Sequence, residues 1–145
     1  MTEHISDGMR QLNYLMGETN AAYHMASVKL GLTDSAMMIM YTLYNYQGRC
    51  LLGDIIKLSG MSKQTANSAL RGLETDGFVT LEAETGRRKA VRLTEKGKAL
   101  SENTVARLIR IENEIFAACS PEEMDAYLGF VRRYLEEFKK RAEKL

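Results

Sequence analysis

The chain has 145 residues, enough for one domain with a helical extension, and 45% of them are hydrophobic while 27% are charged. This composition excludes a disordered chain. No apolar run approaches the ~20 residues of a spanning helix, and no signal-peptide pattern opens the sequence. We therefore expect a cytoplasmic protein with no membrane partner. The net charge is only +1, but between residues 57 and 98 nine Lys and Arg stand against five Asp and Glu, and such a basic patch favours a polyanionic partner.

The first predicted element is a long amphipathic helix from Ile5 to Leu30. Apolar or small residues recur there every three or four positions, which is the spacing of one helix face. They are Met9, Leu12, Met16, Thr19, Tyr23, Ala26 and Leu30. A single stripe of this length favours packing against a second chain or a distant helix.

The second predicted helix runs from Ser35 to about Gln47 and is apolar nearly all round. Thr33 or Asp34 can cap it, and such a helix belongs at the centre of a core. Its methionines and tyrosines also suit the wall of a flexible ligand pocket. We therefore expect a small aromatic or apolar effector to bind where this helix meets the first helix and the helix that starts near Thr94. The candidate residues are Tyr23, Met40, Tyr41 and Tyr44.

A helix-turn-helix follows in the sequence. Gln47–Arg49 is a predicted turn, Leu52–Leu58 a helix of two turns, and Ser59–Met61 a tight connection. The inner residues of the two-turn helix are Leu52, Ile55, Ile56 and Leu58. Ser62 caps a second amphipathic helix over about residues 62–76, with a crowded polar face. In this arrangement the first helix supports the second, the recognition helix, against DNA.

A β-hairpin is predicted over about residues 78–94. Two alternating, β-prone runs flank the basic tip Thr85-Gly86-Arg87-Arg88. The residues expected on their inner face are Phe78, Leu81, Ala83, Val91 and Leu93. A helix-turn-helix followed by a basic hairpin predicts a winged helix-turn-helix domain over residues 33–97.

The sequence after the hairpin predicts two long helices. One begins at Thr94–Gly97 and carries a single stripe of Leu100, Thr104, Leu108, Ile111, Ile115 and Ala118. It ends before Ser120, which can cap the next helix, while Pro121 suits the first helical position and Glu123 completes a capping box. The last helix has apolar residues at the 3.5-residue spacing of a seam for another helix. They are Met124, Leu128, Val131, Leu135, Phe138, Ala142 and Leu145.

The terminal helices exceed what a small winged domain needs to cover itself. We predict a mainly α fold with a small β-hairpin wing, in which residues 1–32 and 98–145 form a dimerisation region. The alternative is an intramolecular three-helix bundle.

Short segments around the predicted helix-turn-helix and hairpin occur in a characteristic order. They are Leu32-Thr33, Leu52–Ser62, Thr65, Leu73-Glu74, Gly77-Phe78-Val79, Arg87 and Val91–Gly97. In this combination the chain resembles the MarR (multiple antibiotic resistance) family of bacterial transcription regulators. The order of helices and hairpin also resembles that family over essentially the entire chain.

The resemblance implies a homodimer that binds palindromic double-stranded DNA, usually as a repressor, and is released by a small molecule or by oxidation. By position, the helix contacts would be Lys63, Gln64, Thr65, Asn67 and Ser68, and Arg87 would be the wing arginine that reaches the minor groove. Two residues depart from the family's pattern. Thr85 stands where an acid often orients the wing arginine, and Ser68 stands where arginine is common.

The polar residues of the recognition helix have chemistry that suits DNA. Gln64 and Asn67 can form paired hydrogen bonds with adenine, and Lys63 can reach guanine or a phosphate. The other predicted contacts reach the phosphate backbone or, for the hydroxyl groups, either backbone or base edge. These are Thr65, Ser68, Arg71, Arg88 and Lys89.

Other classes of protein have less support. The sequence has no glycine-rich phosphate loop or nucleophile elbow, and His4 and His24 do not pair on the first helix, so we expect neither an enzyme nor a cofactor. Cys50 and Cys119 lack a CxxC or Cys/His neighbourhood, which favours reduced thiols in packing positions over a metal site. The alternatives are a metal- or redox-sensing regulator and a winged-helix protein-interaction module that does not bind DNA.

Overall fold

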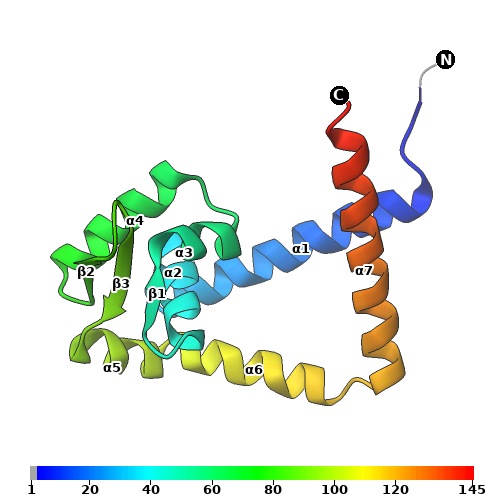
Figure 1. The fold of residues 1–145 in the computed structure, drawn as a ribbon. Helices are drawn as coiled ribbons and strands as arrows, with labels where there is room; N and C mark the ends of the chain where they lie inside the picture. Colours follow the sequence, from blue (N-terminus) through cyan, green and yellow to red (C-terminus); the bar gives the residue numbers. More distant parts are fainter. Residues whose placement is uncertain (1–2) are drawn as a thin grey trace. The chain divides into compact units, whose positions relative to one another are not determined.

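The computed structural model describes residues 3–145, which fold into seven helices and one three-stranded antiparallel sheet (Figure 1). The helices are α1 (Asp7–Lys29), α2 (Asp34–Asn45), α3 (Leu52–Ser59), α4 (Lys63–Thr75), α5 (Glu95–Asn103), α6 (Val105–Ala117) and α7 (Pro121–Ala142). The strands are β1 (Arg49–Leu51), β2 (Val79–Ala83) and β3 (Lys89–Leu93). The described residues up to Leu108 form one compact unit, and Ile109–Leu145 form a second. The predicted mainly α, winged helix-turn-helix fold is confirmed. No helix within residues 3–145 is both long and apolar enough to cross a bilayer.

Side-chain caps set the starts of five helices. Each capping oxygen accepts a hydrogen bond from the backbone N–H three residues later, which satisfies one of the unpaired donors of the first turn. The capping residues are Ser6, Thr33, Ser62, Thr94 and Ser120. The first of them moves the start of α1 from the predicted Ile5 to Asp7, and Pro121 occupies the first position of α7 as predicted.

Helix α2 lies at the centre of the core of the first unit. Its residues Ile39, Met40 and Leu43 are fully buried, and they cluster with apolar residues of the sheet, α3, α4 and the start of α6. Each such side chain contributes about 1.5–3 kcal/mol through burial. The prediction that Leu58 of α3 is an inner residue is wrong, because this eight-residue helix buries Ile55 and leaves Leu58 54% exposed.

The predicted hairpin of β2 and β3 is present, and β1, which was not predicted, pairs with β3 to give a sheet with the strand order β1-β3-β2. Val91 pairs with Cys50 on one side and with Leu81 on the other, and Cys50 and Val91 are buried. The predicted turn through Arg49 ends at Gly48, because Arg49 is already paired with Arg92 of β3.

The single helix predicted after the wing is two helices. The backbone leaves helical geometry at Thr104 (φ −126°, ψ −90°), and α6 begins at the next residue. Ser101 and Thr104 are buried, and their hydroxyl groups donate to carbonyl oxygens four residues earlier, at 2.9 and 2.6 Å. Such bonds bend helices, and an apolar stripe read from sequence does not reveal them.

Helix α5 meets the segment that follows α4 at a contact that only glycine allows. A Cβ atom on Gly97 would lie 1.9 Å from the carbonyl oxygen of Phe78. The same oxygen accepts a hydrogen bond from the Thr94 backbone N–H at 3.1 Å, and the Thr94 hydroxyl donates to the Gly77 carbonyl at 2.6 Å. The exit of α4 is therefore held directly against the start of α5.

Candidate nucleic-acid interface

Helix α4 has one face in the core and one face in solvent. Ala66, Leu70 and Leu73 are buried on the inner side. Ser62 fixes the start of the helix, because its Oγ accepts from the Thr65 backbone N–H at 3.1 Å and donates to the Thr65 hydroxyl at 2.9 Å. The buried side chains and the cap together fix the position of the exposed face of α4.

The residues of α4 predicted to contact DNA are all exposed. They are Lys63, Gln64, Thr65, Asn67, Ser68 and Arg71. Within residues 3–145, only Thr65 of this group uses its side chain in a hydrogen bond or ion pair. The amides of Gln64 and Asn67 and the cations of Lys63 and Arg71 are therefore available to a partner.

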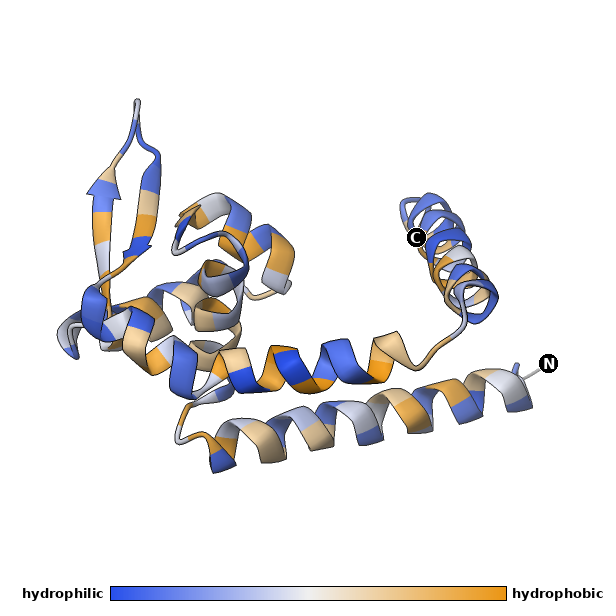
Figure 2. Ribbon diagram, turned by 90° about the horizontal axis from the view of Figure 1, so that it is seen from below, coloured by the Kyte–Doolittle hydropathy of each residue, from blue (hydrophilic) through white to orange (hydrophobic). Residues whose placement is uncertain are grey.

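The hairpin of β2 and β3 projects from the helices of the first unit as a two-stranded arm (Figure 2). Its tip is closed by a hydrogen bond from the Glu84 backbone N–H to the Arg88 carbonyl at 2.9 Å, and Gly86 has a positive φ of 73°. The side chains of Arg87, Arg88 and Lys89 are exposed and make no hydrogen bond or ion pair with the described part of the chain. The wing thus presents three unpaired cations, as the sequence predicts.

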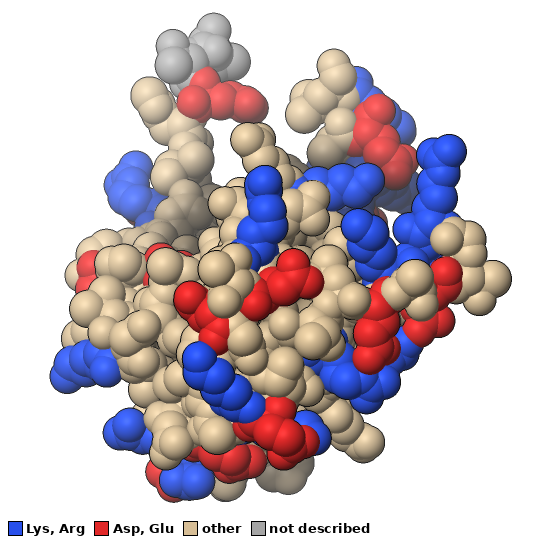
Figure 3. Space-filling model, turned by 90° about the vertical axis from the view of Figure 1, so that its left-hand side faces the viewer, with Lys and Arg blue, Asp and Glu red and all other residues tan. Residues whose placement is uncertain are grey.

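Basic and acidic side chains are interleaved on the face of the first unit shown in Figure 3. Positive charge on this face is therefore divided among separate side chains and does not form a continuous basic field.

A group of ion pairs crosses the solvent face of the sheet, and the sequence did not reveal it. Glu82 of β2 lies 2.6 Å from Arg92 Nε and 3.4 Å from Arg49 Nε, and Arg49 also pairs with Glu84. The pKa of Glu82 lies below its ordinary value, first because Arg92 donates a hydrogen bond to it and then because Arg49 does. The same bond raises the pKa of Arg92. Glu82 and Glu84 are two residues apart, which indicates that both lie on one face of the strand. The basic partner Arg49 could not be found in this way, because β1 was not predicted.

A groove of about 710 Å³ runs between the start of α2 and α4. Gln64, Thr65 and Ser68 line it from α4, and Thr33 and Ser35 line it from the start of α2. No Lys or Arg is among its lining residues. Its lining includes the acidic residue Asp76, so three predicted DNA contacts border a concave surface that carries a negative charge.

The four residues predicted to bind an effector are dispersed in the structure. Met40 is fully buried in the core, Tyr41 and Tyr44 are half-buried against it, and Tyr23 of α1 is exposed. Tyr44 lines a cavity of about 190 Å³. The Tyr44 hydroxyl donates to Glu102 Oε1 at 3.0 Å, which joins α2 to α5 at this point.

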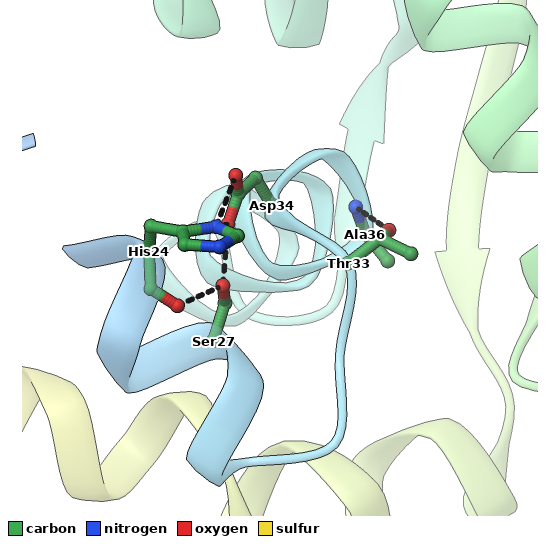
Figure 4. Close-up of polar contacts among 5 residues, drawn as sticks. All are labelled: His24, Ser27, Thr33, Asp34 and Ala36. Carbon is green, nitrogen blue, oxygen red and sulfur yellow. Dashed lines mark hydrogen bonds and ion pairs between the residues drawn. The ribbon is translucent and has the colours of Figure 1, made fainter. Parts of the chain in front are cut away.

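A polar cluster joins the end of α1 to the start of α2 (Figure 4). His24 Nδ1 lies 2.9 Å from Asp34 Oδ2, and the Ser27 hydroxyl hydrogen-bonds to the same carboxylate. In a hydrolytic triad the imidazole lies between the serine and the acid, whereas here the carboxylate lies between them, so His24 cannot take the Ser27 proton. The pKa of Asp34 lies below its ordinary value, first because Ser27 donates a hydrogen bond to it and then because His24 does.

The two cysteines are free. Cys50 is buried in the core, and burial together with the nearby Asp54 raises the pKa of its thiol. Such a thiol is a poor nucleophile and a poor redox sensor. Cys119 is half-buried, and within the described residues no three His, Cys, Asp or Glu side chains come together as metal ligands.

Residues 30–90 match the sequence model of the MarR family. No curated protein matches the chain. Among solved structures, the chain is similar to a MarR family transcriptional regulator from Silicibacter pomeroyi, with 25% identity, a TM-score of 0.69, and coverage of 90% of this chain and 89% of the other.

Two further structures show the same fold at lower identity. NMB1585, a MarR family regulator from Neisseria meningitidis, has a TM-score of 0.83 at 17% identity, over 96% of this chain and 99% of the other. BpsR of Bordetella bronchiseptica, whose DNA binding is regulated by 6-hydroxynicotinic acid, has a TM-score of 0.64 at 22% identity, over 86% of this chain and 98% of the other.

We predict that the His24–Ser27–Asp34 cluster stabilises the fold only while Asp34 is ionised. Because the pKa of Asp34 is lower in the folded state, its contribution is complete above the ordinary carboxyl range and is lost as the pH falls through the lowered pKa of the folded state. Asp34→Asn should lower the urea midpoint at pH 7, and this difference should vanish on acidification.

Two variants check the cause of this effect. Ser27→Ala should raise the pKa of the Asp34 carboxyl, measured by NMR, toward its ordinary value. Asp125→Asn, at an exposed position in α7, serves as the control and should leave the urea midpoint unchanged. A midpoint difference for Asp34→Asn that persists through the acid range would contradict the assignment.

Proposed function

We propose that the protein is a homodimeric, DNA-binding transcription regulator of the MarR family, whose sequence model residues 30–90 match. It represses a palindromic operator in the cytoplasm, where bacterial DNA lies, and a small molecule releases it. Its two recognition helices read half-sites about one helical turn, roughly 10 bp, apart.

One observation carries the DNA-binding part of this proposal. Exposed amides and cations without partners in the described chain are held on rigid elements of one compact unit, with α4 and the wing as their supports. On α4, Gln64 and Asn67 have the groups that hydrogen-bond adenine in the major groove. At the wing tip, Arg87 has the charge and reach for the minor groove.

We expect Gln64→Ala and Arg87→Ala each to weaken binding to a duplex selected from random DNA by about 1–3 kcal/mol. Arg87→Ala should also reduce the salt slope of binding by about one, because one cation no longer neutralises the DNA. Fluorescence anisotropy over a range of salt concentrations measures both effects.

The control is Arg10→Ala, which removes the same charge from the exposed surface of α1. If the double variant with both Gln64→Ala and Arg87→Ala binds DNA as tightly as the unaltered protein, the assigned surface is wrong. A protein that shows no salt-dependent affinity for any duplex would instead be a winged-helix interaction module.

The apolar residues of the terminal helices support the homodimer. Within Pro121–Ala142, all of which the structure describes, no residue is buried, although Leu128, Val131 and Leu135 repeat at the spacing of a helix seam. On α1, Leu15, Met16 and Val28 are each more than half exposed. Apolar surfaces of this extent on a protein mark an interface, and a second copy supplies identical stripes.

Leu135→Asp should convert the dimer to a monomer, because it places a charge in the proposed apolar seam. Analytical ultracentrifugation should show half the mass, and affinity for the duplex should fall because one chain holds one half-site. The control is Lys140→Glu, on the charged face of the same helix by helical spacing. A Leu135→Asp protein that remains dimeric would refute the seam.

The effector part of the proposal is centred on the cavity beside Tyr44. BpsR offers a precedent in which a small aromatic acid regulates DNA binding. The cavity of about 190 Å³ has room for a single aromatic ring, and its lining includes Gln47, Glu102 and Lys98, the last of which is paired with Glu95 at 2.8 Å. A ligand between α2 and α5 would act where the core helix meets the helix that follows the wing.

A thermal-shift screen of phenolic acids and antibiotics should find a compound that raises the melting temperature, since ligand at 100 times its Kd adds about 2.7 kcal/mol. Tyr44→Ala should abolish the shift. Tyr46→Ala, at a neighbouring exposed tyrosine, should keep it. A screen in which no compound raises the melting temperature would count against this site.

A further inference from the structure

Strand β1 connects the wing to the helix-turn-helix. It is three residues long, pairs with β3 through Arg49 and Arg92, and leads directly into α3 at Leu52. β1 and β2 both pair with β3 and not with each other. Any direct link between β1 and β2 must therefore come from side chains that cross β3.

Arg49 makes this link on the solvent face of the sheet. Its guanidinium lies 3.4 Å from Glu82 and is paired with Glu84, while Glu82 also binds Arg92 at 2.6 Å. Ala90, which pairs with Leu51 on one side and Glu82 on the other, is fully buried. A small side chain at this position leaves room for the arginine to cross the strand.

Glu84 stands where the projecting part of the hairpin begins. Its backbone N–H closes the tip loop by bonding to the Arg88 carbonyl, and its carboxylate reaches back to Arg49. Thr85, the next residue, has no charge. Glu84, the acid nearest to Arg87 in the sequence, thus pairs with Arg49 of β1 and does not pair with the tip arginine.

We propose that Arg49 is a positioning residue for DNA binding, which holds the wing through Glu82 and Glu84 so that Arg87 keeps a fixed place relative to α4. This proposal rests on the proposed function, because it assigns the orientation of the same DNA-binding surface. Arg49 itself need not touch DNA. A split contact with two carboxylates suits the planar guanidinium and not the ammonium of lysine.

The key variant is Glu84→Gln, which keeps the size of the side chain and removes a negative charge near the DNA. General electrostatics predicts tighter binding of DNA after this change, whereas a lost wing brace predicts weaker binding. We expect binding to a duplex selected by the unaltered protein to weaken about tenfold, the scale of one lost base or groove contact. Glu95→Gln is the control, because it removes the same charge from an acid that pairs with Lys98 in the same unit, and it should not weaken binding.

A double-variant cycle separates positioning from general damage to the fold. Glu84→Gln should have no further effect in an Arg87→Ala background, since the brace acts through Arg87. Arg49→Ala should behave like Glu84→Gln, and Arg49→Lys should recover part of the affinity. Equal or tighter binding by Glu84→Gln, or the same loss in both backgrounds, would overturn the proposal.

Hydrogen exchange supplies a measurement that does not depend on DNA. The Glu84 amide, which closes the tip, should exchange faster in Glu84→Gln and Arg49→Ala than in the unaltered protein and in Glu95→Gln. If the unaltered protein selects no duplex, the proposed function fails, and faster exchange still supports the brace. Unchanged exchange in both variants overturns the brace whether or not the protein binds DNA.

Discussion

Burial of helix α2 is the constraint on which the rest of the first unit depends. Its residues Ile39, Met40 and Leu43 are inaccessible to solvent and contact apolar residues from every other layer of the unit. Because one helix is surrounded in this way, α3, α4 and the sheet each need only one apolar face. Their other faces are free of any role in the core, and the candidate DNA contacts lie on those faces.

The local parts of this structure could be predicted from the sequence, because their causes are local. A cap such as Ser62 and the helical spacing of Ala66, Leu70 and Leu73 together locate α4 to within one residue. The wing followed from alternation on both sides of a glycine-containing tip. The exposure of the predicted DNA contacts follows from the same helical and strand periods, since a residue opposite the buried face must face solvent.

The features that the sequence did not reveal have causes that are distant in the chain or buried. β1 is too short for a pattern of its own and exists because Arg49–Leu51 pairs with a strand near residue 91. The break after α5 results from hydroxyl groups bonded inside the core, while the apolar stripe continues past it. The effector residues were predicted from the type of their side chains, methionine and tyrosine. The position of each residue on its helix instead places Met40 inside the core and Tyr44 at the edge of the core.

Pairing within the fold explains how a chain with a net charge of +1 can keep a group of unpaired cations on its surface. Three cations of the basic middle region are occupied: Arg92 binds Glu82, Lys98 binds Glu95, and Lys96 donates to the Asp76 carbonyl at 2.7 Å. Those without a partner in the described chain are Lys57, Lys63, Arg71, Arg87, Arg88 and Lys89. Acids therefore pair with Arg92 of the sheet and Lys98 of α5, whereas the cations of α3, α4 and the wing tip have no acidic partner in the described chain. Net charge counts both groups equally, whereas a phosphate backbone interacts mainly with the unpaired group, because a paired arginine must first lose its carboxylate.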